Sequence, residues 1–131
     1  MKTIALSVVV LLACASVSAQ ESRSIGYRTV AEAYTALRKD SNAKFSTQKG
    51  WVLVEVRGGR YLVFWTFTPN TYSAYPAAIK RTFTEVRGAW YVTMQSLCEA
   101  AKPACDQMFE EFKQLNEQMK RDIQNRHKSS N

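Results

Sequence analysis

The sequence is poor in the residues from which catalytic and metal sites are usually built. Its 131 residues include three cysteines and one histidine, His127, which lies in the polar C-terminal tail. A Ser-His-Asp or Cys-His site needs a histidine in the packed body of a domain, and a structural zinc site needs four ligands of the Cys or His type. No glycine-rich loop stands between a strand and a helix to hold a phosphate. We therefore expect no catalytic residues, no metal and no cofactor, and a protein that is not an enzyme.

Long apolar runs are also scarce, and the one present lies at the N-terminus. Lys2 is followed by a nearly uninterrupted apolar run at Ile4–Ala13 and then by small residues. A positive start, an apolar stretch and small residues are the parts of a secretory signal, with cleavage expected before Gln20. The run is about half as long as the ~20 residues that a membrane-spanning helix needs. The sequence thus predicts a signal peptide at 1–19 and a single exported domain at 20–131, located in the periplasm or secreted.

A second interpretation of the leader stays open. The segment Leu11-Leu12-Ala13-Cys14 is similar to a bacterial lipobox, in which the cysteine is acylated and becomes the first residue of the mature chain. Leu12 is bulkier than the usual residue at its position. Acylation of Cys14 would anchor the domain to a membrane, and only in this case do we expect a membrane as a partner.

Both interpretations of the leader leave the same pair of cysteines. Because Cys14 lies in the leader, Cys98 and Cys105 remain in the domain. An exported protein meets an oxidising compartment, where a disulfide is the expected state of such a pair. A redox-active pair would favour C-x-x-C spacing near a helix N-terminus. The longer spacing here favours a structural disulfide.

Apolar periodicity predicts two helices and four strands. Thr29 and Glu32 form a capping box that opens a helix ending near Lys39. Apolar residues at spacings of three and four predict a longer helix over Pro103–Asn125. Four strands are expected at Trp51–Val56, Tyr61–Thr68, Ile79–Val86 and Trp90–Cys98.

The four strands are expected to pair as two hairpins in one antiparallel meander sheet. Gly58 and Gly59 can adopt the positive φ angles of a type I′ turn, and Arg87-Gly88-Ala89 joins the second pair of strands. Between the two hairpins, Pro69–Pro76 is predicted to be a loop, because its two prolines cannot donate hydrogen bonds to a strand ladder. The predicted fold class is α+β with the element order α-β-β-β-β-α. The simplest packing places both helices on one face of the sheet.

The strands carry more aromatic side chains than two helices can cover. Strand alternation sends these side chains to both faces of the sheet, so we expect apolar surface that is either exposed or part of an interface. Coverage by the long loop and the N-terminal arm is the alternative. The candidate interface residues are Trp51, Trp65, Tyr72 and Tyr75.

Basic residues outnumber acidic ones. The formal net charge is +7, or +6 without Lys2, which draws a protein to anionic surfaces. In a meander the first and third connections lie at the same end of the sheet, so Arg57, Arg60 and Arg87 are expected to cluster there. Guanidinium groups bind phosphate and carboxylate well, so the three arginines are a candidate anion-binding edge. The alternative is that they are solvated side chains of two turns and have no binding role. Nucleic acid is not an expected partner, because no binding motif for it is present.

Three short segments carry a family resemblance. They are Tyr75–Arg81, Leu97–Ala100 and Ala104–Asp106. Together they resemble small secreted proteobacterial proteins of unassigned role, and the resemblance covers most of the mature chain. It implies a bacterial envelope setting and supplies no catalytic residues.

These observations favour an exported periplasmic binding or accessory protein. Its expected partner is a protein or an anionic component of the envelope. A secreted inhibitor or immunity-type protein stays open, since such proteins use similar compact sheets tied by disulfides. A hydrolase of envelope material also stays open, because a site can be assembled from residues that show no motif.

The expected processing can be checked by mass spectrometry. The intact mass of the exported protein should correspond to a chain that starts at Gln20. A lipid-modified chain that starts at Cys14 would contradict this expectation and place the domain on a membrane.

Overall fold

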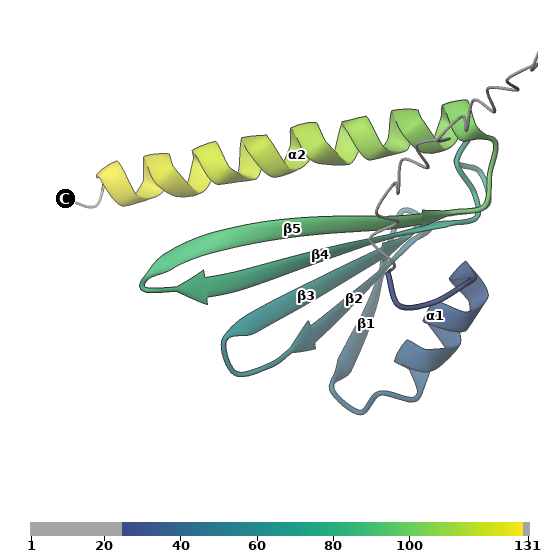
Figure 1. Ribbon diagram of the computed structural model, residues 1–131, viewed down its shortest axis with the longest axis horizontal. Coiled ribbons are helices and arrows are strands. Elements are labelled where there is room, and N and C mark those ends of the chain that lie inside the picture. The colour runs from purple at the N-terminus through teal and green to yellow at the C-terminus, as the bar shows by residue number, and fades with distance from the viewer. Residues whose placement is uncertain (1–24, 130–131) are drawn as a thin grey trace, which may run out of the picture.

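The computed structural model describes residues 25–129, which form a meander sheet with one helix on each side (Figure 1). The expected signal peptide at 1–19, with the acylation site Cys14, lies outside the described residues. The elements are α1 (Val30–Arg38), β1 (Ala43–Gln48), β2 (Trp51–Arg57), β3 (Tyr61–Phe67), β4 (Ala77–Val86), β5 (Ala89–Cys98) and α2 (Lys102–Ser129).

All strands pair antiparallel with their neighbours in chain order, β1-β2-β3-β4-β5. The α+β class and the meander are thus confirmed, but the expected number of four strands is wrong because the sheet has five. The missed strand is β1, an edge strand in which Phe45 is the one large apolar residue. Lys49 and Gly50 join β1 to β2 with φ angles of 50° and 85°, the pair of positive φ angles that a type I′ hairpin turn requires.

The hairpin turns use their glycines differently from the prediction. Neither Gly58 nor Gly59 has a positive φ, so the type I′ turn expected there is wrong. Gly58 is needed for space instead, because a Cβ atom at that position would lie 2.1 Å from the Tyr61 ring. The turn between β4 and β5 does have two consecutive residues with positive φ angles, Arg87 at 52° and Gly88 at 81°.

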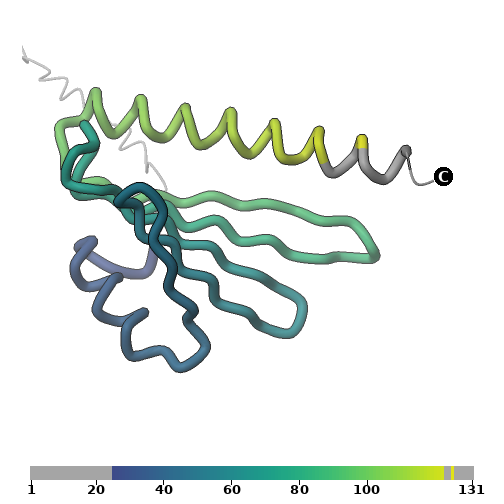
Figure 2. Tube along the Cα trace, turned by 180° about the vertical axis from the view of Figure 1, so that it is seen from behind, coloured from purple at the N-terminus to yellow at the C-terminus, as the bar shows by residue number. Residues whose placement is uncertain are grey.

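The two helices lie on opposite faces of the sheet, so the expectation of both on one face is wrong (Figures 1 and 2). The ladder fixes which side chains share a face. Val54 and Trp65 are paired on the face that α1 covers, which we call the α1 face. Leu53 and Thr66, one residue along each strand, point to the opposite α2 face. Because both faces carry apolar side chains, each needs a cover, and one helix per face supplies it.

The larger core lies between α1 and the sheet. Tyr34 packs edge-on against Phe67 with ring centroids 5.3 Å apart. Trp65 stacks on Phe67 at 6.1 Å and is only 4% exposed. The fully buried members of this core are Ile25, Ala33, Leu37, Val54, Val63, Trp65, Phe67 and Ala78.

The start of α1 is held by three hydrogen bonds. The Thr29 hydroxyl accepts from the Glu32 amide at 3.1 Å, as the capping box predicts. The Glu32 carboxylate accepts from the Arg28 amide at 3.0 Å. The third bond was not foreseen: the Glu99 carboxylate, in the connection between β5 and α2, accepts from the Val30 amide at 2.9 Å. The two helices are therefore linked through one short connection.

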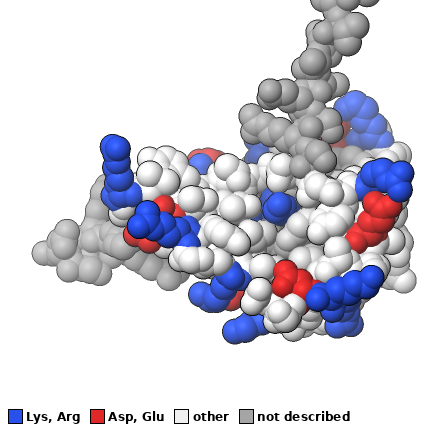
Figure 3. All heavy atoms as spheres, turned by 60° about the horizontal axis from the view of Figure 1, so that its bottom comes forward, with Lys and Arg blue, Asp and Glu red and all other residues white. Residues whose placement is uncertain are grey.

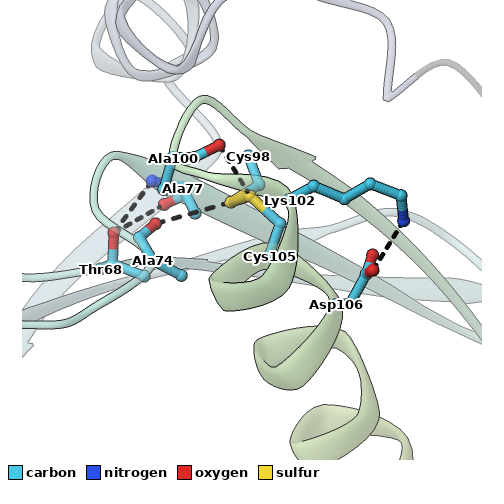
Figure 4. The surroundings of a disulfide bond; sticks show 8 residues. All are labelled: Thr68, Ala74, Ala77, Cys98, Ala100, Lys102, Cys105 and Asp106. Atoms are coloured by element: carbon cyan, nitrogen blue, oxygen red, sulfur yellow. Dashed lines mark hydrogen bonds and ion pairs between the residues drawn. A yellow bond between two sulfur atoms is a disulfide. The ribbon is translucent and has the colours of Figure 1, made fainter.

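The disulfide Cys98–Cys105 is confirmed and ties the end of β5 to the first turn of α2 (Figure 4). Around it, the Thr68 hydroxyl accepts from the Ala77 amide at 2.9 Å, which joins the two ends of the β3–β4 connection. A second core lies under this part of α2, where Met108 is 1% exposed. The remaining buried residues of this core are Ala74, Ala77 and Ile79.

Removing the disulfide should destabilise the domain. Closing so short a loop contributes roughly 2–3 kcal/mol in the chain-entropy model, so the double variant Cys98→Ser, Cys105→Ser should unfold at a lower temperature and lower denaturant concentration than the parent. The exported parent should also show no free thiol under denaturing, non-reducing conditions. Two titratable thiols in that preparation, or equal stability of parent and variant, would contradict a structural disulfide.

Candidate ligand-binding cleft

A cleft runs between α2 and the sheet on the α2 face. It consists of two adjoining hollows of about 470 and 440 Å³. Both hollows are lined by Leu53, Thr66, Arg81 and Leu115. The first continues over Gln48, Lys49, Trp51, Tyr72, Glu111 and Phe112. The second continues over Lys44, Phe45, Ser46, Glu55, Phe64, Trp65, Phe83 and Met119.

The cleft exists because α2 lies along β5 and leaves the α2 face of β1–β3 without a helix. Figure 1 shows α2 running beside β5, at one edge of the sheet. The apolar stripe predicted for α2 is therefore only partly used in packing. Met108 is buried near the disulfide, whereas Leu115, two turns further on, is 43% exposed. Apolar side chains of α2 and of the sheet thus face each other across an open space.

An aromatic wall closes one side of the first hollow. The Trp51 ring lies 4.8 Å from the Tyr72 ring and 6.2 Å from the Phe112 ring, measured between centroids. These side chains come from β2, from the β3–β4 connection and from α2. Aromatic pairs in tilted or edge-on arrangements add to the stability gained from burial, so the wall is a well-packed surface.

A hydrogen bond fixes the rim of this wall. The Tyr72 hydroxyl donates to the Glu111 carboxylate at 2.6 Å. Burial and this bond raise the pKa of Tyr72 to about 12. The bond from Tyr72, with a second from Gln107, lowers the pKa of Glu111. Both shifts favour the neutral phenol paired with the ionised carboxylate.

The floor of the cleft carries one guanidinium group. Arg81 of β4 lies between Ile79 and Phe83, which are both buried on the same face. Its Nη1 atom is 3.6 Å from the Met119 sulfur, and its Cζ atom is 5.7 Å from the centroid of the Phe112 ring. Burial lowers the pKa of Arg81, although an arginine stays protonated in proteins.

Two buried polar atoms in the cleft have no hydrogen-bond partner in the described part of the chain. They are Nε of Arg81 and Oγ1 of Thr66, a residue that is 4% exposed. Buried polar groups are nearly always paired, and an unpaired buried charge is costly. Their position on the floor of an open cleft is consistent with a ligand that would supply the missing partner.

The structure separates the four candidate interface residues. Trp51 and Tyr72 come together on the cleft wall. Trp65 contributes to the lining of the second hollow, but its ring packs in the core on the α1 face and the residue is only 4% exposed, so it is not an exposed interface residue. Tyr75 is 49% exposed and is not part of the cleft lining.

The candidate anion-binding arginines are only partly brought together. Arg60 and Arg87 line one small hollow at the end of the sheet where the two turns lie, as expected, but Glu85 lines the same hollow. Arg57 forms an ion pair with Glu55 on its own strand. Figure 3 shows acidic side chains beside basic ones at this end of the molecule. A neighbouring carboxylate reduces the attraction of the two arginines for an anion.

Sequence reasoning missed Arg81 and Thr66. The available signal was the pattern of β4, in which a charged residue occupies a position that alternation assigns to the same face as Ile79 and Phe83. An arginine within an apolar stripe indicates either a buried ion pair or a binding group.

Comparisons of the chain with protein-family models, curated proteins and solved structures find no match. Within residues 25–129, no group of three or more His, Cys, Asp or Glu side chains could hold a metal ion. Neither described helix is long and apolar enough to cross a membrane.

The bond at the rim predicts a defined pH dependence. A lowered pKa of Glu111 contributes stability that is present above the unfolded-state pKa and is lost as the pH falls through the folded-state value. The raised pKa of Tyr72 contributes stability below its ordinary value near 10, and this is lost as the pH rises through about 12. The bond should therefore persist across the neutral range and fail at both extremes.

Tyr72→Phe should raise the pKa of Glu111 toward its ordinary value, as measured by NMR titration of the carboxyl carbon. Tyr75→Phe changes an exposed tyrosine of the same connection and should leave that pKa unchanged. An unaltered Glu111 titration in Tyr72→Phe would show that the bond does not form in solution.

Proposed function

We propose that this chain is an exported binding protein that holds a single-chain amphiphile in the cleft between α2 and the sheet. The observation that carries the proposal is the apolar lining of the open cleft, contributed by four strands, the β3–β4 connection and α2. The leader predicted from the sequence at 1–19 supports export, and the bacterial envelope is the setting that we propose for it.

The size and lining of the cleft support a small elongated ligand. Each hollow lies within the ~300–1,000 Å³ that is typical of small-molecule sites, which are mostly apolar with a few polar groups. Leu53 and Leu115 line both hollows, so one chain could contact them along its length. Burying an acyl chain there would remove about 25 cal/mol of unfavourable hydration per Å² of apolar surface.

The acidic side chains in the cleft already have hydrogen-bond or ion-pair partners, which supports binding over catalysis. A general acid or base must be able to reach a substrate and exchange its proton with it. In the cleft, Glu111 is held by Tyr72 and Gln107, and Glu55 is held by Arg57. Both carboxylates have structural partners.

A charge placed on the helical wall should weaken binding of an apolar chain. Binding of decanol to the mature protein is measured by calorimetry, or by the change in Trp51 fluorescence with the signal of the other two tryptophans as background. Leu115→Glu puts a carboxylate into the cleft at an exposed position, so folding should be retained, while decanol binding should fall about tenfold or more. Gln114→Glu adds the same charge to the neighbouring exposed position of α2, outside the cleft lining, and should have little effect.

Two results would contradict the proposed function. One is the absence of saturable binding of both decanol and decanoate to the folded parent. The other is equal loss of binding in Leu115→Glu and Gln114→Glu, which would show a general charge effect and no specific cleft.

A further inference from the structure

Arg81 differs in kind from the other residues that line the floor of the cleft. The side chains beside it on the α2 face of β4 are Ile79 and Phe83. Its register partners are Phe64 on β3 and Met94 on β5. A guanidinium surrounded by apolar and thioether groups has given up hydration without gaining a counter-charge.

The acidic residues near the cleft do not supply this counter-charge. Glu111 and Glu55 line the first and second hollows, but they accept from Tyr72 and from Arg57 respectively. Among the described residues, no carboxylate lies within ion-pair distance of Arg81. The guanidinium is left with one long contact to the Met119 sulfur and the face of the Phe112 ring.

A second unpaired group lies diagonally across the ladder from Arg81. Thr66 is paired with Ile79, two residues before Arg81 on the same face, and diagonal neighbours of this kind lie within reach of a common partner. The Thr66 hydroxyl is buried and unpaired, as is Nε of Arg81. Both residues line both hollows, so they mark the junction between the two halves of the cleft.

We propose that Arg81 and Thr66 form the binding site for an anionic head group, and that the ligand is a single-chain amphiphile ending in a carboxylate or a phosphate. This inference rests on the proposed function of the cleft. The planar guanidinium can donate parallel N–H groups to two oxygens of either head group, and the Thr66 hydroxyl can donate to an oxygen of the same group. The chain of the ligand then extends over Leu53 and Leu115 toward the open side.

Basic residues outnumber acidic ones in the cleft lining, with Lys44, Lys49 and Arg81 against Glu55 and Glu111, which favours an anionic over a cationic ligand. Lys49 lines the first hollow and Lys44 the second, and the whole chain carries a net charge of +7. A positive potential around a low-dielectric cleft raises the local concentration of anions and the rate at which they enter. Both lysines are exposed, so they contribute attraction and Arg81 contributes the fixed contact.

Four probes with the same chain separate the head group from the tail. They are decanoate, decyl phosphate, decanol and decyltrimethylammonium, each titrated below its micelle-forming concentration. The parent should bind the better of the two anions about 10- to 100-fold more tightly than decanol, the range that hydrogen bonds to a charged group imply. Decyltrimethylammonium should bind most weakly. The ranking of decanoate against decyl phosphate identifies the head group.

Arg81→Gln should remove this preference and leave decanol binding nearly unchanged. The matched control is Lys80→Gln, which removes one positive charge from the adjacent residue of β4. Lys80 points to the α1 face, with Nζ 5.4 Å from the centroid of the Trp65 ring, so its removal should preserve the preference. Arg81→Lys keeps the charge without the planar fork and should show an intermediate preference; it also serves as the test if Arg81→Gln does not fold.

The outcomes distinguish the head-group inference from the proposed function. Equal binding of decanol and both anions to the parent would overturn the inference while the cleft still binds a chain. An anion preference that persists in Arg81→Gln, or that is lost equally in Lys80→Gln, would assign it to general surface charge and overturn the inference as well. If no probe binds the folded parent, the proposed function itself fails.

Discussion

The covalent link between Cys98 and Cys105 fixes the start of the long helix α2 at one end of the sheet. It joins the last residue of β5 to the first turn of α2, and Met108, one turn further, is buried against Ala77 and Ile79. Beyond this anchor the helix follows β5 at the edge of the sheet (Figure 1). The connection between them also holds α1, since Glu99 caps its first turn. One short segment therefore positions both helices.

This anchoring has a different consequence for each face of the sheet. On the α1 face, the aromatic residues Tyr34, Trp65 and Phe67 pack against one another and complete a core. On the α2 face, the helix lies over the edge and Leu115 stays exposed opposite Leu53. Maximal burial would favour a helix centred on the sheet. The helix instead lies at one edge, with its first turn tied to β5 by the disulfide, and the cleft is the space that results.

Much of the fold could be predicted from residue patterns, because local signals determine it. The cap of α1, the length of α2 to within a few residues and the pairing of the two cysteines all follow from short-range chemistry. β1 was missed because its alternation carries one large apolar side chain, Phe45, which is too weak a signal for a strand. The faces covered by the helices depend on packing between distant segments, which periodicity does not report.

The candidate site was harder to predict for the same reason. The sequence predicts Trp51 and Tyr72 as interface residues, and the structure brings them together with Phe112 of the distant α2. The basic turns drew attention to Arg57, Arg60 and Arg87, since their charge is visible in the sequence. Arg81 has the same charge, but its importance comes from burial without a counter-charge. That property arises only after β3, β4 and α2 have assembled.

NMR titration with decanoate shows directly whether the space between α2 and the sheet binds a ligand. If the cleft is the binding site, amide shifts should change at Leu53, Thr66, Arg81 and Leu115 and saturate together, while α1 and the end of the sheet that carries Arg60 and Arg87 stay unaffected. Shifts confined to the exposed turns, or spread evenly over both faces of the sheet, would contradict it.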